Sequence, residues 1–228
     1  MFDYEEACPI SRASTILCER WTLQIIREML FGATRFSELQ HFLPRLSPTL
    51  LNTRLRTLED AGIVVRKKIA EKKGYEYRLT PSGQALKPVL MAMGKWGINW
   101  VFDAMDPDQL NLSALVRDFA VALRVDQLPE GDSTIQITFS GEERPARKFI
   151  LVRQGAAQTC EDNMGTDVDV YLTADRETFG RIWFGEISVL SAVKTGRLKV
   201  VGTTFYVRTV SRWLGVSELA AERLEKSA

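Results

Sequence analysis

Polar side chains recur every third or fourth residue in the segment SPTLLNTRLRTLEDAG, which starts at residue 47. At this spacing they share one side of a helix. The side chains concerned are Thr49, Asn52, Thr53 and Arg56. Short hydroxyl and amide groups, together with a guanidinium, are the groups that bind base edges and phosphates in a DNA groove. The segment therefore predicts a helix that reads nucleic acid.

The elements that would position these groups form a helix-turn-helix. Leu51, Leu55 and Leu58 follow an i, i+4, i+7 pattern, which predicts an amphipathic helix over residues 47–61 with its leucines packed inward. Ser47 suits the N-cap of this helix, and Pro48 suits its first helical position. A shorter helix in RFSELQHFL and a turn at residues 44–46 precede it.

A basic hairpin follows. Residues 63–69 and 75–79 are predicted strands, and a glycine in the connecting EKKG permits a tight turn. Its basic residues are Arg66, Lys67, Lys68, Lys72, Lys73 and Arg78. A cationic hairpin after a helix-turn-helix is typical of a winged helix, whose wing contacts phosphates or a minor groove. A protein-binding module with a solvated ribbon is the alternative interpretation.

We expect the DNA contacts to come from the second helix and the wing. The candidate residues are Ser47, Pro48, Thr49, Asn52, Thr53, Arg54, Arg56, Lys67, Lys68, Lys72, Lys73 and Arg78. Asn52 can make a bidentate contact to adenine, whereas Arg54 and Arg56 suit phosphate or guanine. The wing lysines would neutralise phosphates, which adds affinity with little sequence preference.

The charge distribution also indicates that the N-terminal half of the chain binds nucleic acid. The chain has 228 residues, which is enough for two ordinary globular domains, and its net charge is +1. Residues 1–102 hold 15 Lys/Arg and 10 Asp/Glu, whereas residues 103–228 hold 15 and 19. The N-terminal half is therefore the candidate for polyanion binding. No apolar run of about 18 residues occurs and the acidic N-terminus lacks signal-peptide features, so we expect a cytoplasmic protein.

Several classes of chemistry are disfavoured. The cysteines are Cys8, Cys18 and Cys160, which provide neither a disulfide framework nor the spacing of a zinc site. His41 is the only histidine, which argues against a histidine-based metal site or a Ser-His triad. There is also no glycine-rich nucleotide loop. We therefore expect no enzymatic activity, no cofactor and no metal.

A long amphipathic helix is predicted from residue 81 to 102. Its apolar positions are Leu86, Val89, Leu90, Met93, Trp96, Trp100 and Val101. This stripe exceeds what a winged helix needs to cover, and aromatic-rich surfaces are typical of subunit interfaces, so we expect a homodimer. A two-fold dimer would present two reading helices roughly 34 Å apart, one turn of B-DNA, and would select a palindromic site.

A second domain is expected at residues 109–228, after a first domain at residues 1–103. A helix over 112–124 precedes a change to period-two alternation, as in TIQITF. Further predicted elements follow at 147–155, 156–162, 167–174, 175–184, 188–194 and 198–202, and then one or two terminal helices. Helices segregated from a sheet predict an α+β fold.

Residues 8–102 resemble the HxlR-type winged-helix transcriptional regulators. The resemblance is carried by CPISRAS, ERWTLQIIREML, RFSELQ, LSPTLLNTRLRTLEDAGIVVRK and YEYRLTPSG. It implies a dimeric DNA-binding regulator. The sequence departs from the family pattern where Cys18-Glu19-Arg20 replaces the usual Gly-Lys before the tryptophan.

Some members of that family sense electrophiles or oxidants through an N-terminal cysteine, and Cys8 stands at that position. A thiol at a helix N-terminus can have a lowered pKa because the helix dipole favours the thiolate. The neighbouring Glu5 and Glu6 oppose this effect. A capping or packing role for Cys8 is the alternative.

Residues from about 110 to 215 resemble the sterol-carrier-protein-like domain, through DVDVYLTADRETFGRIWFG and AVKTGRLKVVG. The resemblance implies a mixed sheet with helices that enclose an apolar cavity for hydrophobic molecules. The candidate lining residues are Phe149, Leu151, Phe179, Ile182, Trp183, Ile187, Leu190, Val193 and Leu198. Ordinary core packing is the alternative for each of them.

These expectations combine into a dimeric transcriptional repressor that binds palindromic DNA. Its C-terminal domain would sense a hydrophobic effector or brace the dimer. The alternative is a small-molecule or lipid carrier whose winged helix binds a protein. An enzyme acting on a lipid-like substrate is disfavoured, because no nucleophile–base pair is visible.

Overall fold

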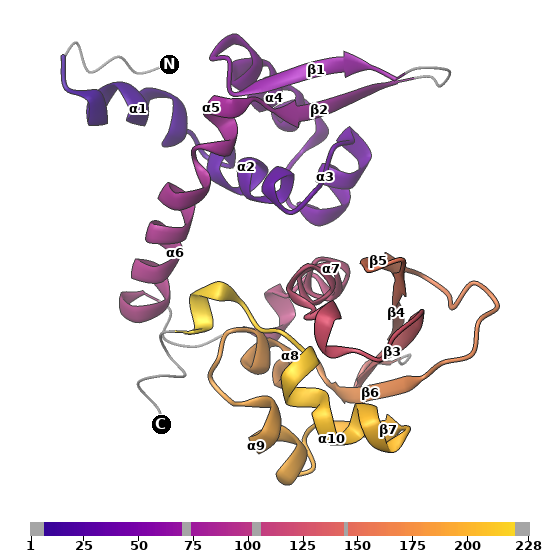
Figure 1. The fold of residues 1–228 in the computed structure, drawn as a ribbon. Helices are drawn as coiled ribbons and strands as arrows, with labels where there is room; N and C mark the ends of the chain where they lie inside the picture. Colours follow the sequence, from indigo (N-terminus) through magenta and orange to yellow (C-terminus); the bar gives the residue numbers. More distant parts are fainter. Residues whose placement is uncertain (1–6, 70–73, 102–105, 144–145, 222–228) are drawn as a thin grey trace. The chain divides into compact units, whose positions relative to one another are not determined.

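The computed structural model describes residues 7–69, 74–101, 106–143 and 146–221 (Figure 1). The chain divides into two compact units, Met1–Gly94 and Lys95–Ala228. This division falls inside a helix, whereas the sequence places the domain boundary at residues 103–108. Within the described ranges, no helix combines the length and the apolar character needed to span a membrane.

The first unit is a helix-turn-helix with a two-stranded wing. Its helices and strands are α1 (Pro9–Leu17), α2 (Thr22–Leu30), α3 (Phe36–Phe42), α4 (Pro48–Asp60), β1 (Val64–Lys68), β2 (Tyr75–Leu79), α5 (Pro81–Gln84) and the start of α6 (Lys87–Trp100). The strands pair antiparallel, with Val64 opposite Leu79. A single bridge joins Arg35, just before α3, to Glu76 of β2. The winged helix predicted from the sequence is confirmed.

The helix predicted over residues 81–102 is broken in two. The short α5 ends at Gln84, and α6 starts at Lys87. Pro88 explains the break, because proline has no amide hydrogen and its ring clashes with the carbonyl four residues earlier, which here belongs to Gln84. Gly83 allows α5 to approach the base of the wing closely, since a Cβ there would collide with the carbonyl oxygen of Ile63.

The core of the first unit is built from α2, α3, α4 and the base of the wing. Its fully buried residues include Ile25, Ile26, Leu39, Leu51, Leu55 and Leu58. Helix α1 contributes no buried residue, and only Ile16 and Leu17 near its C-terminal end pack partly against this core. Helix α1 is therefore joined to the unit mainly through its last turn.

The second unit is a mixed five-stranded sheet with helices. Its helices and strands are α7 (Leu112–Ala122), β3 (Ser133–Ser140), β4 (Ala146–Arg153), β5 (Ala156–Cys160), β6 (Val170–Asp175), α8 (Arg176–Trp183), α9 (Val189–Lys194), β7 (Lys199–Gly202) and α10 (Thr204–Trp213), with short 3-10 helices at Pro107–Gln109, Val125–Gln127 and Glu218–Ala220. The strand order is β5-β4-β3-β6-β7. Strand β3 runs parallel to β6 and antiparallel to β4. The predicted α+β class is confirmed.

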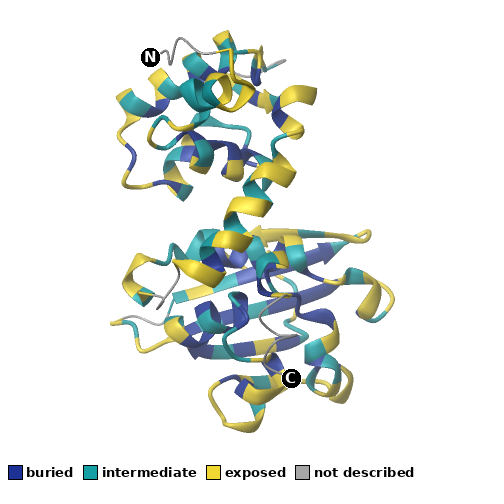
Figure 2. Ribbon diagram, turned by 90° about the vertical axis from the view of Figure 1, so that its left-hand side faces the viewer, coloured by how far each residue is buried: buried dark blue, intermediate teal, exposed yellow. Residues whose placement is uncertain are grey.

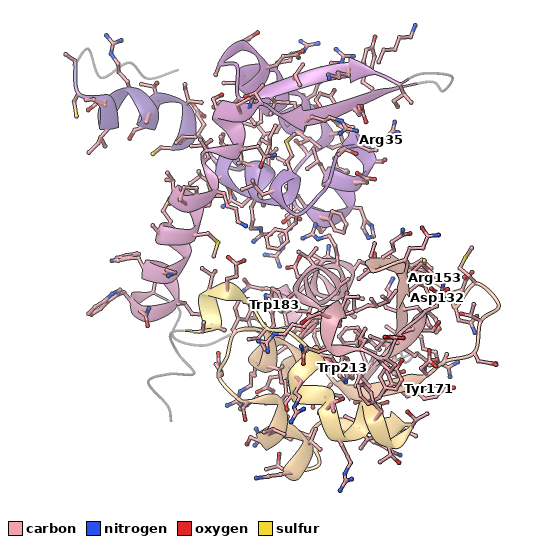
Figure 3. All side chains as sticks on the ribbon, in the orientation of Figure 1. Arg35, Asp132, Arg153, Tyr171, Trp183 and Trp213 are labelled. Atoms are coloured by element: carbon pink, nitrogen blue, oxygen red, sulfur yellow. The ribbon has the colours of Figure 1, made fainter. Side chains whose placement is uncertain are left out.

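The core of this unit lies between one face of the sheet and the helices. Ile135, Ile137 and Phe139 of β3 are fully buried, and Figure 2 shows buried residues along the inner strands. The rings of Phe119 and Trp183 meet edge to face at 5.2 Å between centroids. Trp183 and Trp213, both labelled in Figure 3, belong to this core. The Phe139 ring of β3 meets the Phe179 ring of α8 at 5.1 Å between centroids, so β3 packs against a helical aromatic side chain.

Candidate nucleic-acid interface

The turn between α3 and α4 is fixed by hydrogen bonds and one buried leucine. The side-chain amide of Gln40 donates to the carbonyl oxygen of Leu46 at 2.5 Å, and Leu46 is 1% exposed. Ser47 caps α4 as predicted, because its Oγ accepts a hydrogen bond from the Leu50 amide at 3.3 Å. Pro48 occupies the predicted first position of the helix. These contacts fix where α4 begins.

Opposite its buried leucines, α4 presents one exposed polar face. We call this surface the reading face, and it consists of Ser47, Pro48, Thr49, Asn52, Thr53 and Arg56, all of which are exposed. The predicted split of the helix into a core stripe and a polar face is confirmed. Contact of the reading face with DNA remains a prediction.

Two hydroxyl groups on or next to the reading face donate hydrogen bonds to carbonyl oxygens of α4 itself. Thr53 Oγ1 donates to the carbonyl oxygen of Thr49 at 3.0 Å, and Thr57 Oγ1 donates to that of Thr53 at 3.1 Å. With its hydrogen used in this way, Thr53 offers lone pairs to base amino groups and a methyl group to thymine. Among the side chains that project from α4 on this face, Asn52 and Arg56 supply the N–H donors.

Arg54 does not join the reading face. Its Nε donates to the carbonyl oxygen of Arg20 at 2.9 Å, and a terminal nitrogen lies 2.7 Å from Glu19 Oε2. Only 15% of its side chain is exposed. The sequence prediction grouped Arg54 with Arg56, although a residue two positions away on a helix points about 200° around the axis. That angular offset is the signal that would have separated them.

The described part of the wing carries exposed cations. Lys67 and Lys68 on β1 are exposed, whereas Lys72 and Lys73 lie outside the described residues. The Arg66 guanidinium lies 3.6 Å from the centroid of the Tyr75 ring, a cation–π contact that holds it along the hairpin. The wing therefore presents positive charge beside the helix-turn-helix.

Arg78 is paired within its own strand. Its Nε and a terminal nitrogen donate to the two carboxylate oxygens of Glu76, each at 3.1 Å. The hydrogen bonds from Arg78 lower the pKa of Glu76, and the charges of Arg78, Arg35 and Lys67 add to this effect. Glu76 and Arg35 were not among the predicted site residues. The carboxylate offsets part of the positive charge that the sequence assigned to the wing.

Cys8 is exposed at the N-cap position of α1. The backbone amides of Ser11 and Ile10, followed by the Ser11 side chain, lower the pKa of the thiol. The opposing residues named in the sequence analysis, Glu5 and Glu6, lie outside the described residues. A reactive role for Cys8 therefore remains a prediction.

The predicted ligand-lining residues of the second unit do not all lie in the core between the sheet and the helices. Those in or against the core between sheet and helices are Phe179, Ile182, Trp183, Ile187, Val193 and Leu198. Phe149 and Leu151 lie opposite Gln136 and Thr134, on the other face of the sheet from Ile135. Leu190 is 51% exposed. These three residues do not line a common site with the others.

Metal binding finds no support in the side chains that are described. Across the four described ranges, no three His, Cys, Asp or Glu residues gather closely enough to hold a metal ion.

Helix-turn-helix, exposed polar helix and cationic wing define a winged-helix DNA-binding protein. Residues 16–105 match the HxlR-like helix-turn-helix family. The chain is 42% identical over 98 residues to the uncharacterized HTH-type transcriptional regulator YvaP of Bacillus subtilis, which covers 42% of this chain and 91% of YvaP. It is 37% identical over 101 residues to the uncharacterized HTH-type transcriptional regulator sll1512 of Synechocystis. This match covers 44% of this chain and 75% of sll1512.

Among solved structures, the reduced form of the transcriptional regulator YodB from B. subtilis aligns with a TM-score of 0.39 and 30% identity, over 44% of this chain and all of that one. The sequence relationship to YvaP extends over most of the relative's length. The chain therefore belongs to the HxlR-like helix-turn-helix family of transcriptional regulators. The family match lies within residues 16–105, and the five-stranded sheet lies outside it.

Proposed function

We propose that this regulator is a homodimeric repressor that binds a palindromic operator through α4 and the wing. The observation that carries the proposal is the reading face, a continuous exposed polar surface opposite the buried leucines of α4. Its first-turn residues Ser47, Pro48 and Thr49 would approach base edges and the backbone. Asn52 and Arg56 would supply the base-specific donors, and Lys67, Lys68, Lys72 and Lys73 would neutralise phosphates.

The dimer is supported by an apolar stripe on α6. Its residues Val89, Met93, Trp96 and Trp100 are 44%, 52%, 61% and 75% exposed. They follow i, i+4, i+7 and i+11 spacing, so they share one side of the helix. Contiguous exposed aromatic side chains are typical of an interaction surface, and a symmetric dimer would cover this stripe with its copy.

The second unit is proposed as an effector sensor or a dimer brace. In the sensor version, a hydrophobic molecule binds between sheet and helices beside Phe179, Ile182, Trp183 and Leu198, and shifts the spacing of the two reading helices. A preference of about 1–3 kcal/mol for one spacing would be enough to regulate binding. The sterol-carrier-like resemblance suggests this version. In the brace version, the unit only extends the dimer interface.

Selection of bound duplexes from a random DNA pool, at low and moderate salt, tests the proposal. We expect a palindrome with half-sites one helical turn apart. Nonspecific binding that vanishes at moderate salt, without enrichment of any sequence, would contradict specific recognition. In that case the winged helix would be assigned to a protein partner, and the carrier interpretation would become the leading one.

A further inference from the structure

Arg54 lies against the segment between α1 and α2, away from the reading face. On the helix it lies about 100° beyond Thr53 and about 200° from Asn52, on the flank of the buried leucine stripe. From there its guanidinium reaches the segment between α1 and α2, where it contacts Arg20 O and Glu19 Oε2. Two nitrogens of one planar group thus bind two successive residues of that segment.

The segment that Arg54 contacts is tightly defined. Trp21 adopts a left-handed conformation, with φ of 77°, which is uncommon for a bulky residue and needs support from its surroundings. The Thr22 amide donates to the Glu19 carbonyl at 3.0 Å. The Arg20 guanidinium lies over the Trp21 ring, 5.6 Å from its centroid. Arg54 therefore binds a fixed turn rather than a loose loop.

This turn also sets the direction in which α1 extends from the core of the first unit. Helix α1 has no buried residue, and Ile10 near its start is 76% exposed. Its attachment is through its C-terminal end and the turn at residues 18–21. A contact between that turn and the middle of α4 therefore couples the orientation of α1 to the position of the reading face.

We propose that Glu19 and Arg54 form a latch that positions the reading face of α4 relative to α1, so that Arg54 is a positioning residue and not a DNA contact. The latch rests on the proposed function, because it assumes that α4 reads an operator. The Glu19 and Arg54 side chains are only 29% and 15% exposed, so removing one partner also costs stability. The folded fraction of Glu19→Gln and Arg54→Gln is therefore measured by urea unfolding, and affinities are compared only between folded proteins.

The sign of the Glu19→Gln effect separates a latch from a phosphate contact. If Arg54 contacts phosphate, removal of the competing carboxylate frees the guanidinium and tightens DNA binding. If the pair is a latch, the same change weakens operator binding, although it removes a negative charge. We expect about three- to tenfold weakening, within the range of coupling between residues in contact. Asp60→Asn is the matched control, because Asp60 is an exposed acid on α4.

The experiment measures operator affinity against salt for the full-length wild type, Glu19→Gln, Arg54→Gln, Arg54→Lys, the double variant Glu19→Gln/Arg54→Gln, and Asp60→Asn. A latch predicts weaker binding for Glu19→Gln but not for Asp60→Asn, a double variant no weaker than Arg54→Gln, and an unchanged salt slope. Arg54→Lys should retain only part of the affinity. Tighter binding by Glu19→Gln, together with a slope reduced by about 0.9 in Arg54→Gln, would overturn the latch.

Hydrogen exchange provides a readout that needs no DNA. In Glu19→Gln the amides of residues 19–22 and of the middle of α4 should exchange faster together, while those of α3 stay unchanged. Unchanged exchange in both segments would overturn the latch even if no operator existed. Failure of the wild type to select an operator would instead count against the proposed function alone.

Discussion

Among the single residues of the reading face, Asn52 has an amide that both donates and accepts, which allows a bidentate contact to adenine. We predict that Asn52→Ala costs about 1–3 kcal/mol at one base pair and relaxes the preference there. Affinities for the operator and its substitutions at each position would measure this. Lys67→Ala is the control, since loss of a phosphate contact should weaken all sequences alike. Uniform weakening by Asn52→Ala would contradict base reading.

The Cys8 thiol gives a second test at this scale. Its pKa is lowered by amides at the start of α1, so the reactive thiolate forms at lower pH than in an ordinary cysteine. The rate of alkylation of Cys8, followed by peptide mass spectrometry, should therefore reach half its maximum at lower pH in the folded protein than in urea. Ser11→Ala removes one stabilising group and should move the midpoint upward. Equal midpoints in folded and unfolded protein would contradict the prediction.

Residue-level prediction from sequence succeeded where one interaction dominates. The leucine period of α4 is set by burial, and Ser47 with Pro48 marks its start, so both were found from the residues alone. Arg54 and Arg78 were grouped with the DNA contacts, although their guanidinium groups are paired with Glu19 and Glu76. Such pairs join residues 35 positions apart or lie within one strand, and charge counting does not reveal them.

At the scale of elements, the wing carries an internal counter-charge that can be removed. Glu76→Gln should release Arg78 and tighten DNA binding at low salt, with a salt slope steeper by about one contact. Electrophoretic or anisotropy titrations at several salt concentrations would measure both quantities. Glu177→Gln, an acidic residue of α8 in the second unit, is the control and should leave the slope unchanged. A slope unaltered in Glu76→Gln would show that Arg78 does not contact phosphate.

The packing of α7 against the chain after α10 makes a stability prediction. A Cβ at Gly215 would collide with the carbonyl group of Ala122, which ends α7. Because main-chain atoms cannot move aside like a side chain, we expect Gly215→Ala to destabilise the second unit by about 1–3 kcal/mol. Urea unfolding followed by tryptophan fluorescence would measure the loss.

Gly97→Ala is the control for this substitution. A Cβ at Gly97 has nothing within 4 Å, and alanine favours a helix by roughly 0.5–1 kcal/mol over glycine. Its stability should be equal to or slightly greater than that of the wild type. If Gly215→Ala were as stable as Gly97→Ala, the close approach of the two backbones would be disproved.

Element-level prediction was limited by apolar runs without a clear period. FILV in β4 gives no alternation, so the sequence could not assign Phe149 and Leu151 to the face opposite Ile150. In α9 the buried residues are Val189 and Ala192, which leaves Leu190 exposed, and six residues are too few to fix a helical phase. The register of the sheet and the packing of neighbouring helices decide these positions.

The whole molecule joins a winged helix of a known regulator family to a sheet-containing unit outside the family match. The excess of basic residues lies in residues 1–102, which include the reading face and the wing, whereas residues 103–228 carry more acidic than basic residues. Electrostatic attraction to DNA therefore acts on the first unit. The second unit need not touch DNA itself. Regulation through it would act on the spacing of the two reading helices or on the fraction of the protein that is dimeric.

The dimer is the assembly on which this scheme depends, and it can be tested through the α6 stripe. Buried aromatic side chains at interfaces typically contribute about 2 kcal/mol or more, roughly a thirtyfold change in the dissociation constant. The double variant Trp96→Glu/Trp100→Glu should therefore be monomeric at micromolar concentration in sedimentation experiments. It should bind a palindrome no better than a single half-site. Leu190→Glu, at an apolar position on α9 that is 51% exposed, is the control and should remain dimeric. If the α6 variant stayed dimeric, the subunit interface would lie elsewhere, and half-site spacing would have to be explained without α6.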